Sequence, residues 1–170
     1  MRCSVALFGI VALTGVGVFV TVGCENKPST PVGSSSDPVV MVEKDDKELT
    51  AARQQAVAQL PKFWEALANP KDNEGDFALK VAVSDGTSTE YFWCNDLERK
   101  DGKLSGVINN EPTLVKNVKE GERIAITDDK VWDFVWSRGD NMVGNVTARV
   151  LIKRSTDPRM KELAKTIIDP

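Results

Sequence analysis

The sequence predicts an α+β domain in which an N-terminal amphipathic helix packs on a curved antiparallel β-sheet or a small barrel of about six strands. Three observations support this prediction. A helical pattern of apolar residues comes first, several short stretches of alternating apolar and polar residues follow, and turn-forming residues separate these stretches. We expect a single domain over residues 45–170, which ends in a short helix.

The helix is predicted from apolar residues that recur at three- and four-residue steps. They are Leu49, Ala52, Ala56, Leu60, Phe63 and Leu67. Asp45 and Asp46 suit a helix start. Pro61 falls inside the pattern, where it would kink the helix or begin a second short one. We expect Phe63 and the adjacent tryptophan to face the sheet instead of a ligand.

The strands are predicted from alternation and from the turn residues between them. They cover residues 77–83, 89–94, 104–108, 122–127, 131–137 and 142–152. The last two would form a long hairpin over residues 131–154, with residues 138–141 as its turn. Asp157 and Pro158 begin the terminal helix. This order favours a meander-like antiparallel sheet.

The composition excludes several classes of function. The 170 residues contain no histidine, which removes the commonest general base and the commonest neutral metal ligand. The net charge is −3, and no basic stripe is present, so we expect no nucleic-acid partner. Cys94 is the one cysteine in the predicted domain, and a buried structural thiol is its expected role. The sequence therefore predicts neither a metal site nor a cofactor.

The N-terminus predicts a lipoprotein signal. A positive start at Arg2 precedes an apolar run over residues 5–22, and small residues then lead to Cys24. This resembles a bacterial lipobox, with residues 1–23 as the signal peptide and lipidation, palmitate included, at Cys24. Thr21 departs from the leucine usual three positions before the cysteine. An uncleaved membrane anchor and simple secretion remain as alternatives.

Residues 24–44 are predicted to form a flexible tether, because they are rich in Ser, Pro, Thr and Gly. Glu25 follows the cysteine in place of the aspartate that retains many lipoproteins at the inner membrane. By resemblance to that rule we expect the domain to be anchored in the bacterial cell envelope, at the outer membrane and facing the periplasm.

Six residues make up the candidate binding surface. They are Trp93, Asn109, Asn110, Glu111, Asp133 and Arg149. Tryptophans can line a groove, and the amide and carboxylate side chains of the 109–111 turn would form its polar lip. Arg149 is expected to pair with Asp133 across the hairpin or to hold a ligand carboxylate. Asp128 and Asp129 are expected to lie in a solvated turn instead of a cation site.

A set of motifs in order resembles the bacterial YegJ-like family, known as domain of unknown function 2314. The segments are residues 60–64, 77–81, 90–93, 106–112, 118–123, 142–144 and 147–151. The resemblance covers roughly residues 50–152. It implies no particular activity, although some family members look like lipoproteins. Cys94 stands where members carry Val or Ile, which favours a structural role for that position.

The leading functional hypothesis is a non-enzymatic binding or interaction module, attached to the membrane through a lipid and facing an envelope protein partner. The absence of any catalytic constellation in the sequence motivates it. One alternative is a cell-wall-acting hydrolase that uses Glu111 and Asp133 as a carboxylate pair. Another is an immunity-like protein that binds a toxin.

Overall fold

A computed structural model describes residues 46–170, so the predicted signal peptide, Cys24 and the tether lie outside the described residues. The elements are α1 (Lys47–Ala68), β1 (Glu74–Ser84), β2 (Thr89–Lys100), β3 (Lys103–Ile108), β4 (Arg123–Ile126), the 3-10 turn η1 (Asp128–Lys130), β5 (Val131–Arg138), β6 (Asn141–Gly144), α2 (Val146–Arg154), α3 (Pro158–Thr166) and β7 (Ile167–Ile168). The predicted α+β class is confirmed.

The strands form one mixed sheet of seven strands in the order β4-β3-β2-β1-β5-β6-β7. Each neighbouring pair is antiparallel except β6 and β7, which are parallel. The sheet is open, with β4 and β7 as its edges, so the barrel alternative is wrong. The sheet buries its apolar face under a helix, and this arrangement needs no closure.

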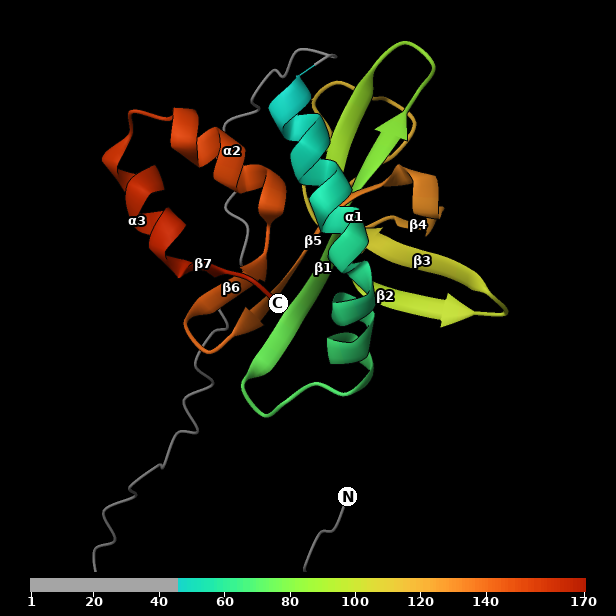
Figure 1. Cartoon of the computed structure of the whole chain (residues 1–170). Helices are drawn as coiled ribbons and strands as arrows, with labels where there is room; N and C mark the ends of the chain where they lie inside the picture. Colours follow the sequence, from blue (N-terminus) through green and yellow to red (C-terminus); the bar gives the residue numbers. More distant parts are fainter. Residues whose placement is uncertain (1–45) are drawn as a thin grey trace, which may run out of the picture. The chain divides into compact units, whose positions relative to one another are not determined.

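Helix α1 covers one face of the sheet and lies across β1 and β5 (Figure 1). Asp46 caps the helix, because its carboxylate accepts the main-chain N–H groups of Glu48 at 3.0 Å and Leu49 at 3.1 Å. The fully buried Phe63 ring lies 5.6 Å from Phe134 and 6.0 Å from Trp136, centroid to centroid. The predicted packing of Phe63 on the sheet is therefore confirmed.

Pro61 does not divide the helix, because α1 runs unbroken from Lys47 to Ala68. The proline lies on the exposed side, while Phe63 two residues later is fully buried. A proline removes one main-chain donor and crowds the preceding turn. Burial of the apolar face on the sheet outweighs this local cost.

The predicted long hairpin over residues 131–154 is wrong in its second half. Strands β5 and β6 pair around the expected turn, with Arg138 opposite Asn141, but β6 ends at Gly144. Gly144 and Asn145 adopt left-handed conformations with φ of 91° and 48°, which take the chain out of the strand. Residues Val146–Arg154 then form helix α2.

The C-terminal end combines the expected helix with an unexpected strand. Asp157 caps α3 by accepting the N–H of Arg159 at 2.9 Å, and Pro158 occupies the first turn, as the sequence predicts. The two residues of β7 then add to β6 in parallel, with Met142 opposite Ile167. A two-residue strand leaves no alternation to detect, so the sequence does not predict it.

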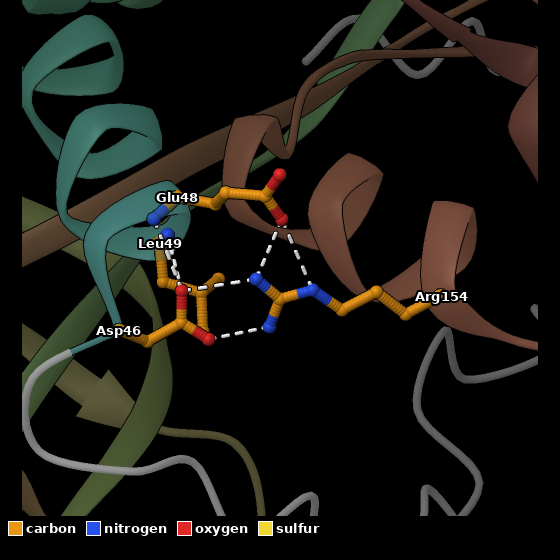
Figure 2. A network of polar contacts seen from close by, with 4 residues as sticks. All are labelled: Asp46, Glu48, Leu49 and Arg154. Atoms are coloured by element: carbon orange, nitrogen blue, oxygen red, sulfur yellow. Dashed lines mark hydrogen bonds and ion pairs between the residues drawn. The ribbon is translucent and has the colours of Figure 1, made fainter.

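Arg154 joins the C-terminal end of α2 to the first turn of α1 (Figure 2). Its guanidinium donates to Glu48 at 2.6 and 3.1 Å and to both oxygens of Asp46, one of them at 3.0 Å. These bonds lower the pKa of Asp46 from 3.8 to about 2, and the Arg154 pKa is raised in turn. The carboxylate that caps α1 therefore also fixes α2 beside it.

Candidate functional site

The surface that combines exposure with aromatic bulk lies on the central strands, and we call it the aromatic surface. It consists of Lys80 on β1, Tyr91 and Trp93 on β2, and Trp132 on β5. Side chains alternate between the two faces of a sheet. Phe92 is buried in the core, so its neighbours Tyr91 and Trp93 point to the opposite face.

Direct contacts join the members of the aromatic surface in two pairs. The rings of Tyr91 and Trp132 lie 4.6 Å apart, centroid to centroid, at an interplanar angle of 52°. Lys80 is opposite Trp93 in the strand register, and its Nζ lies 5.5 Å from the Trp93 ring centroid. Tyr91 is 37% exposed, and the two tryptophans are partly exposed. The result is an aromatic platform of two contacting pairs on neighbouring strands, with Lys80 beside Trp93.

Arg53 of α1 borders this platform. Its Nη2 donates to the main-chain oxygen of Asp129 at 2.7 Å, and its Nε donates to that of Val131 at 3.4 Å. Its guanidinium carbon lies 4.8 Å from the ring centroid of Trp132. Burial raises the pKa of the Tyr91 hydroxyl, and the nearby charge of Arg53 opposes that rise.

The turn at residues 109–111 lies directly beside the platform. The main-chain N–H of Asn109 donates to the Trp93 carbonyl at 2.9 Å, and the Trp93 N–H donates to Asn110 Oδ1 at 3.0 Å. The structure thus brings together Trp93, Asn109 and Asn110 of the predicted surface. Glu111 follows on the exposed side. It lines an open depression of 390 Å³ together with residues 112, 115, 116 and 118–120.

Glu90 fixes the loop that carries this turn. Its buried carboxylate accepts four donors, which are the N–H groups of Thr113, Leu114 and Val115 and the Thr113 hydroxyl, at 2.8 to 3.2 Å. Burial alone would raise the pKa of Glu90. The hydrogen bonds that it accepts, with the one from the Leu114 N–H as the largest, hold this pKa below its ordinary value. Glu90 is therefore a structural anchor of the loop.

Asp133 lies away from any surface, with an exposed fraction of 0%. Its carboxylate accepts the N–H groups of Phe134 at 2.8 Å, Val146 at 3.1 Å and Thr147 at 2.7 Å, and the Thr147 hydroxyl at 2.6 Å. Asn145 precedes α2 but makes no side-chain cap. Asp133 supplies the N-terminal cap of α2 from a different element, which is a structural role.

Arg149 does not pair with Asp133, so this part of the prediction is wrong. It lies on α2, and its Nη1 donates to Asp169 at 2.7 Å. Its Nε is buried and has no hydrogen-bond partner within residues 46–170. The expected pairing required a strand at Arg149, and a helix directs the side chain toward the C-terminal segment instead.

Cys94, Asp128 and Asp129 are the other candidate residues that the sequence singles out. Cys94 is buried as expected, and burial raises the pKa of its thiol to about 12. Asp128 and Asp129 lie exposed in η1, as expected for a solvated turn. The part of the chain from residue 46 onward contains no group of three His, Cys, Asp or Glu side chains placed to hold a metal ion.

Sequence reasoning missed three residues at this site, namely Arg53, Lys80 and Tyr91. For Tyr91 a signal was present, because it shares the outward positions of its strand with Trp93. Lys80 likewise alternates with the apolar residues of its own strand. Arg53 gave no signal, since its contact with Trp132 joins segments far apart in the sequence.

The fold and this surface together define a class: a helix-covered, open, mixed β-sheet with a contact between aromatic residues of β2 and β5. More particularly, the chain belongs to a family described as "Uncharacterized protein conserved in bacteria (DUF2314)", whose model matches residues 46–167. The match covers nearly all of the described domain, and it agrees with the family resemblance expected from the motifs.

The chain is also similar to two curated proteins, the first of which supports the same assignment. The chain is 31% identical to "Uncharacterized protein YegJ" of Escherichia coli (strain K12) over 133 residues, which cover 78% of this chain and 86% of the relative. It is 26% identical over 132 residues to "Putative ankyrin repeat protein NMB1133/NMB1171" of Neisseria meningitidis serogroup B, with 73% of this chain and 52% of that protein covered. The chain thus spans about half the length of the second relative. No solved structure matches the chain.

Among residues 46–170, none of the helices has the length and apolar character that a membrane-spanning helix needs.

Proposed function

We propose that this protein is a lipid-anchored binding module of the bacterial cell envelope, held by Cys24 at the outer membrane and facing the periplasm. The apolar run over residues 5–22 and the small residues before Cys24 support the anchor. The tether over residues 24–44 gives the domain reach toward a partner. The module acts by binding and catalyses no reaction.

The observation that carries this proposal is the contact between the exposed Tyr91 and the half-buried Trp132. Tyr and Trp combine a large apolar area with a polar group, and they are enriched where proteins bind partners. Strands and the Trp93–Asn110 hydrogen bond hold the platform in place, so little conformational freedom is lost on binding.

The hydrolase alternative receives no support from the site. A carboxylate pair needs both groups exposed to one substrate. Glu111 is exposed, but Asp133 is fully buried and both of its oxygens accept hydrogen bonds. The immunity-like alternative remains one possible outcome of a search for the partner.

Site-specific photo-crosslinking in intact cells tests the binding surface. A photoreactive residue replaces Tyr91, which is 37% exposed, and in a matched control it replaces Val57 of α1, which is 39% exposed. We expect one defined adduct from position 91 and none from position 57. Equal labelling at both positions, or none at either, would overturn the proposed surface.

The anchor is tested separately by metabolic labelling with radioactive palmitate. The wild-type chain should incorporate label and sediment with outer membranes, whereas Cys24→Ala should lose both properties. Cys94→Ala serves as the control, because Cys94 is buried within the domain. Label that survives Cys24→Ala would contradict lipidation at that residue, whereas membrane sedimentation of the wild-type chain without label would favour an uncleaved anchor.

A further inference from the structure

The arrangement of Arg53 identifies the chemistry that the aromatic surface would take. Two main-chain carbonyls, of Asp129 and Val131, accept hydrogen bonds from its Nη2 and Nε. Its guanidinium is thereby fixed beside the Trp132 ring. A guanidinium held in one orientation binds a planar anionic group with little further loss of conformational entropy.

No acidic side chain within the described residues neutralises Arg53 by an ion pair. None of the salt bridges found over residues 46–170 includes it. The carboxylate of Asp129, whose carbonyl it contacts, bonds to the Thr127 hydroxyl at 2.6 Å and pairs with Lys130 at 3.6 Å. The buried carboxylate of Glu90 is satisfied by its own loop. The positive charge of Arg53 therefore remains available to a ligand.

The groups around the rings fit a sugar better than a lipid tail. Next to Trp93 lie the exposed Asn109 and the half-buried Asn110. An amide side chain both donates and accepts hydrogen bonds, as the neighbouring hydroxyls of a sugar require. The apolar face of a pyranose ring stacks on aromatic rings such as those of Tyr91 and Trp132.

We propose that the aromatic surface binds an anionic glycan, whose sugar rings stack on Tyr91 and Trp132 and whose carboxylate is held by Arg53. This inference rests on the proposed function, because it names the ligand of the same surface. Arg53 is the specificity-determining residue, since it distinguishes an acidic sugar from a neutral one.

The test uses the full chain in detergent micelles and measures binding by the change in tryptophan fluorescence. The probes are an oligomer of galacturonic acid and the same oligomer with its carboxylates methyl-esterified. We expect the acidic oligomer to bind at least about tenfold more tightly, because esterification removes the charge-assisted hydrogen bonds to Arg53. Equal affinity for the two oligomers, or no binding of either, would overturn the inference.

Two variants separate specific recognition from general charge. Arg53→Gln should abolish the preference for the acidic oligomer. Arg99→Gln should keep that preference, although Arg99 is a similar arginine whose guanidinium carbon lies 4.9 Å from the Trp64 ring. An equal loss in both variants would show a nonspecific effect of charge and count against the proposal.

Tyr91→Ser covers the case in which Arg53→Gln does not fold, because Tyr91 accepts no hydrogen bond from Arg53. It should weaken binding of both oligomers, and unchanged binding would overturn the stacking of sugar rings on Tyr91.

Two other probes test other classes of ligand. If an oligoglutamate peptide or phosphatidylglycerol vesicles bound more tightly than the acidic oligomer, the glycan would be overturned, and the ligand would be an acidic protein or a membrane. A specific crosslink at position 91 without oligomer binding would refute the glycan and leave the binding module standing.

Discussion

The carboxylate of Asp133 on β5 accepts the main-chain N–H of Thr147 on α2 at 2.7 Å and the Thr147 hydroxyl at 2.6 Å. Both residues are buried. A helix N-terminus has N–H groups without partners inside the helix, and here a neighbouring strand satisfies them. This side chain therefore stabilises the start of α2, directly after β6 ends.

Asp133→Ala should therefore destabilise the protein strongly. It leaves buried donors of Val146 and Thr147 without an acceptor, which predicts a loss of about 3 kcal/mol in the free energy of unfolding. Urea unfolding followed by circular dichroism measures it. The matched control is Asp140→Ala in the exposed β5–β6 turn, which should change stability by less than about 0.5 kcal/mol. Similar losses in both variants would contradict the capping role.

Arg154 should make stability depend on pH through Asp46. The folded-state pKa of Asp46 is about 2, below its ordinary value of 3.8, mainly because of its hydrogen bond to Arg154. A carboxylate with a lowered pKa contributes stability above its unfolded-state pKa and loses it as pH falls through the folded-state pKa. The difference between wild type and Arg154→Gln should therefore be constant above about pH 5 and shrink toward pH 2.

Chemical denaturation across that pH range checks this dependence, and carbon-detected NMR titration should show the Asp46 pKa rising in Arg154→Gln. The control is Lys165→Gln, which breaks an exposed pair with Glu162. It should leave the Asp46 titration unchanged, because exposed ion pairs act only locally. An unchanged Asp46 pKa in Arg154→Gln would contradict the link between α1 and α2.

Cys94 should be inert while the protein is folded. Burial raises the pKa of its thiol to about 12, so almost no thiolate exists near pH 8, and the sulfur is inaccessible. In a variant with Cys3→Ala and Cys24→Ala, iodoacetamide should react only after denaturant is added, as mass spectrometry can measure. Rapid alkylation of the native protein would contradict a structural role and reopen a redox one.

Local pattern was enough to predict most of the fold. In the stretch that became β1 and β2, the buried Leu79, Val81, Phe92 and Cys94 all follow the expected alternation. The N-terminal helix follows its apolar periodicity from end to end. In both elements the local preference agrees with the tertiary packing, and this agreement makes an element predictable.

Helix α2 could not be predicted in the same way. Val146, Thr147, Val150 and Ile152 are β-branched, which favours a strand. Val146, Ala148 and Val150 also alternate with the polar residues at 145, 147 and 149, as in a strand. The cap that starts the helix comes from Asp133, which lies 13 residues before Val146 and 14 before Thr147. The sequence next to the helix start therefore gives no sign of this cap. Sequence spacing likewise placed Arg149 opposite Asp133, whereas the helix places it against Asp169.

The sequence predicted the part of the candidate site that residue type and local position indicate, and it missed the part that depends on tertiary packing. Trp93 and Asn110 stood out by residue type and by their position at a strand and a turn, and a direct hydrogen bond joins them. Arg53 carries the charge that suggests a ligand class, but it reaches Trp132 only because α1 packs beside β5. Only tertiary structure gives that contact.

Gly144 gives the sharpest test of how the chain leaves the sheet. Its φ is +91°, and a Cβ there would lie 2.4 Å from a ring carbon of Phe134 and 2.6 Å from its carbonyl oxygen. Gly86 has nearly the same φ, +90°, but open space around the same position. Both alanine variants carry the backbone strain of a left-handed residue, and only Gly144→Ala adds a collision with the core.

Gly86→Ala should thus cost about 1 kcal/mol, while Gly144→Ala should cost at least about 3 kcal/mol, because Phe134 is fully buried and cannot move aside. Thermal unfolding of both variants measures the difference, and the intensity of near-ultraviolet circular dichroism reports on the packing of Phe134 and Trp136. Equal costs would mean that the chain relaxes around residue 144. The close approach of Gly144 to Phe134 would then not be what ends β6.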